Sequence, residues 1–142
     1  RIVAATDAVV NLTVGGIPID LVRYPHPLLA PPGPGPSGFP VAGLLDLATF
    51  KLAAVARRGI RRDFWDLQAI AASGISLETA CRAYTERFGR AESDLYHVVR
   101  ALLYFDDAER EDALPRGMSG SYWSETKRFF REAGPALLAV ER

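Results

Sequence analysis

Hydrophobic and polar positions follow two different patterns along this chain, and the change falls near residue 40. Before it, β-branched residues cluster on both sides of Gly15-Gly16, in AVVNLTV and IPIDLVRY. Paired glycines supply the positive φ angles that two-residue turns need, so residues 8–24 are predicted to form a β-hairpin. Pro18 cannot donate a ladder hydrogen bond, so we expect it to face outward or to lie at the start of its strand.

A proline-rich segment, residues 25–40, follows the predicted hairpin. Seven of its sixteen residues are proline and it has no periodicity, which is typical of a semi-rigid extended connector. Beyond it, apolar residues recur at helical spacing almost to the end of the chain. The predicted fold class is α+β, a β-hairpin followed by a bundle of four to five helices. We expect residues 1–40 and 41–142 to form one structural unit.

The predicted helices have recognisable ends. The expected segments are residues 47–58, 61–72, 77–88, about 92–105, and a last one from about residue 122. Asp46 and Ser76 are suited to cap the first and third, and Gly59 to end the first. Gly134-Pro135 is expected to bend or break the last helix.

Composition excludes several classes of protein. The chain has 142 residues, enough for one domain, and 17 basic residues balance 17 acidic ones, so no overall charge draws it to nucleic acid or membrane. With 49% hydrophobic and 24% charged residues, disorder over most of its length is excluded. Its single cysteine, Cys81, cannot form an intramolecular disulfide, and no segment resembles a membrane span or a signal peptide. We therefore expect a cytoplasmic protein.

The most informative segment is residues 46–67, DLATFKLAAVARRGIRRDFWDL. Lys51 lies in a helix that is apolar nearly all round, and Arg58, seven residues later, returns to the same face. Cations in such a place need partners, which could be carboxylates or an anion from outside. The available carboxylates are those of Asp46, Asp63 and Asp66.

Two interpretations of this segment stay open. In the simpler one, Lys51 extends to the surface while Arg62 and Asp66, four residues apart, form an ordinary helix ion pair. In the other, Lys51 and Arg58 converge on phosphate, because lysine provides a point charge and arginine a planar two-pronged donor.

Asp20 lies in the second strand of the predicted hairpin, on the face opposite Ile19 and Leu21. It is either a solvent-facing aspartate or a carboxylate ligand for a divalent cation. His26 and His97 have no second ligand at metal spacing, and no paired base activates a nucleophile. The acidic run of residues 106–112 is expected to be a charged turn.

The sequence resembles the AbiEii/AbiGii nucleotidyltransferase toxins, a branch of the polymerase-beta-like nucleotidyltransferase fold. The resemblance rests on the spacing of the polar residues within residues 46–67. It is supported by Asp20 in VGGIPIDLVRYP and by the downstream LLYFDDAERE with Trp123. It extends over about residues 11–127, and residues 1–40 would then hold the end of a nucleotidyltransferase sheet.

The resemblance implies transfer of a nucleoside monophosphate from a nucleoside triphosphate (NTP) to an RNA such as tRNA. Magnesium ions would neutralise the phosphates, and a cognate antitoxin would be the partner. The resemblance implies that Asp20, Lys51 and Asp63 are catalytic, with Asp20 as a metal ligand. It also implies that Lys51, Arg58 and Arg62 bind the nucleotide. Asp46 and Asp66 would be structural supports. Asp63 would orient the cations or take part in catalysis.

The sequence departs from the family pattern at its first motif, a glycine turn followed by an Asp-x-Asp pair. Gly15-Gly16 is followed by Asp20 alone, so the chain taken as given is expected to be inactive. Because the chain starts at Arg1 and its only methionine is Met118, we expect an N-terminal truncation. Either a missing segment supplies the motif, or the chain is a remnant that has lost catalysis. The alternatives are a non-catalytic helical module that binds RNA or protein, and a helical domain whose charges only solubilise it.

Overall fold

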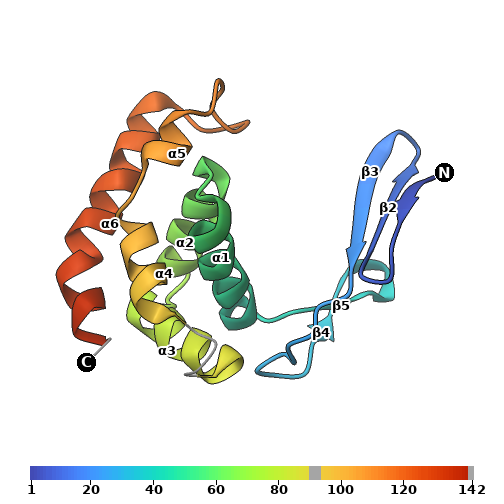
Figure 1. The fold of residues 1–142 in the computed structure, drawn as a ribbon, viewed down its shortest axis with the longest axis horizontal. Coiled ribbons are helices and arrows are strands. Elements are labelled where there is room, and N and C mark those ends of the chain that lie inside the picture. Colours follow the sequence, from blue (N-terminus) through green and yellow to red (C-terminus); the bar gives the residue numbers. More distant parts are fainter. Residues whose placement is uncertain (90–93, 141–142) are drawn as a thin grey trace.

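The computed structural model describes residues 1–89 and 94–140. A sheet and a group of packed helices stand apart in it, joined by a connector (Figure 1). The strands are β1 (Ile2–Ala5), β2 (Val9–Val14), β3 (Ile17–Val22), β4 (Gly33–Pro34) and β5 (Pro40–Val41), with a 3-10 turn at Pro36–Gly38. The helices are α1 (Leu44–Arg58), α2 (Arg61–Ala72), α3 (Leu77–Phe88), α4 (Leu95–Leu102), α5 (Asp106–Glu109) and α6 (Gly120–Val140). The predicted α+β class is confirmed.

The main sheet is antiparallel, in the order β1-β2-β3. Strands β2 and β3 form the predicted hairpin, and Gly15 and Gly16 have φ angles of 56° and 81°, the left-handed values that a tight hairpin turn requires. Pro18 is exposed near the start of the edge strand β3, where its missing N–H costs little. Strand β1, which pairs with the other edge of β2, was not predicted.

The proline-rich connector is tied to the helices at its beginning. The Tyr24 ring packs edge-on against Phe50 of α1, and the His26 ring packs against Phe88 of α3, both with ring centroids 4.7 Å apart. The Leu29 amide donates a hydrogen bond to the Asp46 carboxylate. Further along, β4 and β5 pair over two residues each, so the connector is not extended throughout.

The hydrophobic core lies in the helical part. Helix α1 packs against α2, α3 and α4, and α6 runs along the outer side of the bundle against the same three (Figure 1). The largest fully buried side chains include Leu52, Phe64, Leu67, Leu102 and Phe130. Burying each of these contributes about 1.5–3 kcal/mol. No helix in the described part of the chain is long and apolar enough to span a bilayer.

Helices α2 and α3 begin and end as predicted, with the Ser76 hydroxyl accepting from the Thr79 amide and Gly59 ending α1 at a φ of 54°. The prediction for α1 was wrong at its start, because the helix begins at Leu44 with Gly43 as the N-cap. Asp46 is inside the first turn, where its carboxylate bonds other parts of the chain instead of capping the helix.

Three predictions for the C-terminal part need correction. Helix α6 continues through Pro135, which is exposed, while the fully buried Leu137 keeps the following turn packed on the core. The acidic run contains the short helix α5 and is not only a charged turn. Helix α4 is shorter than expected at its C-terminal end, and residues 92–93 of that prediction lie outside the described residues.

Candidate functional site

Four of the charged residues singled out from the sequence meet where α1 ends and α2 begins. The Lys51 Nζ lies 3.2 Å from Asp63 Oδ1 and 2.5 Å from Asp66 Oδ2. The Arg58 Nε lies 2.7 Å from Asp63 Oδ2, and its Nη2 lies 3.0 Å from Asp63 Oδ1. We call Lys51, Arg58, Asp63 and Asp66 the α1–α2 cluster.

The local sequence explains why the cluster forms. Seven residues make almost two helical turns, which places Lys51 and Arg58 on one face of α1. Gly59 ends α1 in the left-handed conformation, and α2 begins at Arg61, so the chain reverses within two residues. Asp63 then lies in the first turn of α2, where the helix dipole favours a negative charge.

The carboxylate of Asp63 is the centre of the cluster. Its side chain is 0% exposed, against 19% for Lys51 and 55% for Arg58. A buried carboxylate is stable only with partners, and Asp63 accepts hydrogen bonds from both cations. The hydrogen bonds to Asp63 raise the pKa of Arg58 above its ordinary value, although partial burial acts in the opposite direction.

This geometry leaves part of each cation available to an anion. Lysine carries three N–H donors and arginine five, and the bonds to the two aspartates use two on each. Asp63 therefore fixes two positive groups relative to each other, and each of them keeps N–H donors that these bonds do not use. The ion pair expected between Arg62 and Asp66 is not among the contacts of the described residues, because Asp66 pairs with Lys51 and Arg62 is exposed.

Asp20 does not join the cluster. It is exposed on β3, in the sheet that stands away from the helices in Figure 1, and its carboxylate accepts a hydrogen bond of 2.6 Å from Asn11. A divalent cation needs several oxygen ligands, whereas Asp20 is alone and both Asp63 oxygens already bond cations. Within residues 1–89 and 94–140, no three metal-ligating side chains gather. The described residues do not fit a metal site.

Asp46 holds together three parts of the chain. Its buried carboxylate accepts from the Leu29 amide at 2.9 Å and from Arg87 of α3 at 3.1 Å. The Arg87 guanidinium also donates to the Thr49 hydroxyl at 2.8 Å and lies 4.0 Å from the centre of the Phe50 ring. This buried group joins the connector and α3 to the start of α1.

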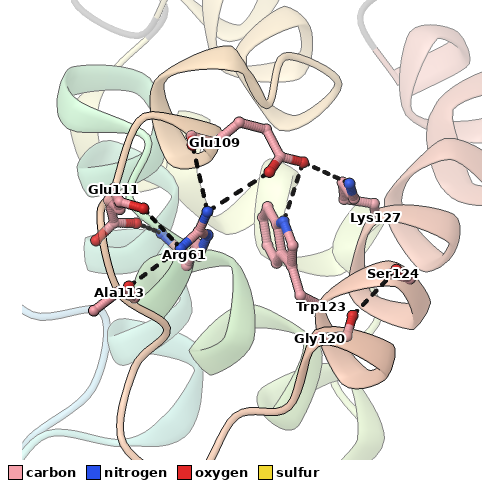
Figure 2. Close-up of polar contacts among 8 residues, drawn as sticks. All are labelled: Arg61, Glu109, Glu111, Ala113, Gly120, Trp123, Ser124 and Lys127. Carbon is pink, nitrogen blue, oxygen red and sulfur yellow. Dashed lines mark hydrogen bonds and ion pairs between the residues drawn. The ribbon is translucent and has the colours of Figure 1, made fainter.

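A second polar cluster, centred on Arg61, was missed from the sequence (Figure 2). The Arg61 guanidinium donates to the backbone carbonyls of Glu111 and Ala113, each at 3.1 Å. The backbone N–H of Arg61 donates to Glu111 Oε2 at 2.7 Å. The N-cap residue of α2, Ile60, makes no side-chain capping bond, so Glu111, fifty residues away in the chain, supplies the bond instead.

Glu109 completes this second cluster, as Figure 2 shows. Its carboxylate accepts from the Trp123 indole at 3.2 Å and from the Lys127 amine at 2.5 Å. The bond from Lys127 lowers the pKa of Glu109 below its ordinary value. The acidic run was the only signal of this cluster in the sequence, and its partners lie too far along the chain for local spacing to identify them.

Comparison with known proteins defines the class of this chain. The model of a family of nucleotidyltransferase toxins matches residues 4–137, nearly the whole chain. The chain therefore belongs to the family described as nucleotidyl transferase AbiEii toxin, type IV toxin–antitoxin system.

A curated relative also matches most of this chain. The chain is 31% identical over 121 residues to uncharacterized protein aq_aa25 of Aquifex aeolicus (strain VF5). The aligned segment covers 82% of this chain and 55% of the relative. The chain thus spans about half the length of that relative. No solved structure matches this chain.

Proposed function

We propose that this chain is part of a nucleotidyltransferase toxin that moves a nucleoside monophosphate from an NTP to an RNA acceptor. In this reaction an acceptor hydroxyl oxygen loses its proton to solvent and forms a bond to the α-phosphorus. The bond from that phosphorus to the bridging oxygen breaks, and pyrophosphate leaves. The α1–α2 cluster is the part that binds the triphosphate. Membership of the AbiEii family supports both the reaction class and an antitoxin partner.

The observation that carries the proposal is the preorganised pair of cations on Asp63. Phosphoryl transfer depends on positive groups that are already in place as negative charge develops. Lys51 and Arg58 are both held by a fully buried carboxylate and keep further donors. Lys51 and Arg58 bind the phosphates, Arg62 on the exposed side of α2 assists them, and Asp63 and Asp66 are positioning residues.

The family implies magnesium, and Asp20 is the carboxylate that the resemblance assigns to it. Since the described residues do not fit a metal site, no step on this chain is assigned to a metal. The side chains of the α1–α2 cluster bind the NTP.

A thermal-shift titration tests the proposal, with each of the four ribonucleoside triphosphates and magnesium. A ligand at 100 times its Kd stabilises the folded state by about 2.7 kcal/mol, which raises Tm by several degrees. We expect one or more nucleotides to raise the Tm of the wild-type chain and to have no effect on Lys51→Ala. Asp63 keeps its two bonds from Arg58 in this variant, so we expect the chain to fold.

The chain has a matched control, Lys127→Ala, at the only other lysine. The two lysines have similar surroundings. The Lys127 side chain is 21% exposed and pairs with one carboxylate, and the Lys51 side chain is 19% exposed and pairs with two carboxylates. Lys127→Ala should keep the nucleotide shift. If no nucleotide shifts the wild type, or if both variants lose the shift equally, the triphosphate-binding role fails.

A further inference from the structure

A groove lies between the end of α1 and helix α4, and Arg58 is the one residue of its lining to which the proposed function gives a role. Its cavity volume is about 730 Å³. Its lining includes arginines and tyrosines, namely Arg57 and Arg58 from α1, Tyr96 and Arg100 from α4, and Tyr104 just beyond α4.

The groove carries exposed positive charge, since Arg57, Arg58 and Arg100 are all exposed. Among the described residues, Arg57 and Arg100 form no ion pair. The lining also holds two aspartates: Asp107 pairs with Arg110, whereas Asp94 accepts from the His97 amide and keeps its negative charge, so three arginines outnumber two carboxylates. An anionic ligand therefore meets exposed guanidinium groups with few competing contacts.

The aromatic side chains narrow the choice of ligand. Tyr96 and Tyr104 are each 49% exposed, and the Arg100 guanidinium lies 5.5 Å from the centre of the Tyr96 ring. Flat exposed rings beside exposed arginines are what single-stranded nucleic acids require, because bases stack on the rings while phosphates bind the cations. An acidic peptide would use the arginines and leave the rings without a matching surface.

The position of the groove connects it to the α1–α2 cluster. Arg58 lines the groove and also holds Asp63, so the two sites share one side chain. Helix α4 has eight residues and is about 12 Å long, which matches about three stacked nucleotides of one strand.

We propose that the groove between α1 and α4 binds the single-stranded end of the RNA acceptor and leads it to the nucleotide at the α1–α2 cluster. Arg57 and Arg100 contact phosphates, and Tyr104 stacks on a base. This inference rests on the proposed function for the identity of the ligand as acceptor, whereas binding of single-stranded RNA can be measured without nucleotide.

Fluorescence anisotropy with a labelled, unstructured 12-nucleotide RNA tests the inference on the whole chain. Each phosphate contact contributes about 0.7 to the slope of log K against log salt, so Arg57→Ala/Arg100→Ala should reduce the slope by about 1.4 and weaken binding about 25-fold at 0.1 M salt. The matched control is Arg82→Ala/Arg128→Ala, at two exposed arginines on α3 and α6, which should bind as the wild type does.

The stacking contact has its own pair of variants. Tyr104→Ala should weaken binding by about 5- to 150-fold, whereas Tyr104→Phe keeps the ring and should keep the affinity. Far-UV circular dichroism and the Tm of each variant establish that it is folded, and a nucleotide shift that persists in Arg57→Ala/Arg100→Ala separates this groove from the triphosphate site.

Three results would overturn the groove assignment. They are equal RNA affinity in groove and control variants, no loss of affinity in Tyr104→Ala, and displacement of the RNA by polyglutamate at equal charge concentration, which would indicate an acidic protein partner. RNA binding that depends on the groove, in a chain whose Tm no nucleotide raises, would overturn the proposed transfer function and still support the groove as an RNA site.

Discussion

The sheet and the helical bundle of this chain differ in how much apolar surface they bury. No residue of β1, β2 or β3 is fully buried, and Ile2, Ile17 and Leu21 are 57–66% exposed. In the bundle, Phe64 and Phe130 are 0% exposed. Sheet and bundle therefore have different sources of stability, since the sheet is held by ladder hydrogen bonds and the bundle by a packed core.

The largest expected effect tests this difference directly. The Phe64 ring packs against the rings of Phe105, Trp123 and Phe130, with centroids 5.3–5.9 Å apart. Phe64→Ala should lower the free energy of unfolding by about 3–5 kcal/mol, because it removes buried area and leaves a cavity. Ile17→Ala in the sheet should change it by less than about 0.5 kcal/mol. Urea denaturation measures both, and similar losses would contradict the comparison.

A somewhat smaller effect is expected where the connector meets the bundle. Asp46→Ala leaves the Arg87 charge buried without its carboxylate, and among the described residues two nitrogens of that guanidinium already have no hydrogen-bond partner. The free energy of unfolding should fall by about 3 kcal/mol.

The same variant should also loosen the connector, because the Leu29 amide loses its acceptor. Limited proteolysis should then cut within residues 25–40 faster than in the wild type. Asp107→Ala is the control, since its exposed pair with Arg110 contributes at most about 1 kcal/mol. A control that destabilises the chain as much as Asp46→Ala would show that burial of the pair does not matter.

The smallest effect concerns pH. The pKa of Glu109 is lowered in the folded state by its bond from Lys127, so the carboxylate stabilises the fold above its ordinary pKa near 4.3. That stability is lost as the pH falls through the lowered pKa. Glu109→Gln should therefore lose less stability between pH 6 and pH 3 than the wild type does. Thermal unfolding across this range measures it, and an unchanged acid dependence would contradict the role of Glu109.

Local spacing predicted what depends on neighbours in the chain. Gly15-Gly16 identified the hairpin, and the seven-residue interval from Lys51 to Arg58 placed both cations on one face. Of the three carboxylates predicted as available partners, Asp63 and Asp66 pair with these cations, whereas Asp46 pairs with Arg87.

Contacts between distant segments could not be predicted in this way. Nothing near Asp46 in the sequence indicates Arg87, forty-one residues later, so local spacing predicts only a helix cap at this position. Nothing in the local sequence distinguishes Arg61 from its neighbour Arg62, and only packing of α5 and the following loop on α2 shows that Arg61 is buried. The roles of Asp20, Lys51 and Asp63 in catalysis stay predictions.

The capping of α2 by Glu111 sets an order of events in folding. The bond from the Arg61 backbone N–H closes a loop of fifty residues, and such long-range contacts form late because loop closure costs entropy. Asp63 lies two residues further along the same helix end, yet its bonds from Lys51 and Arg58 close loops of only twelve and five residues. During synthesis, the contacts of the α1–α2 cluster therefore need no residue beyond Asp66, whereas the bond that caps α2 can form only once Glu111 has left the ribosome.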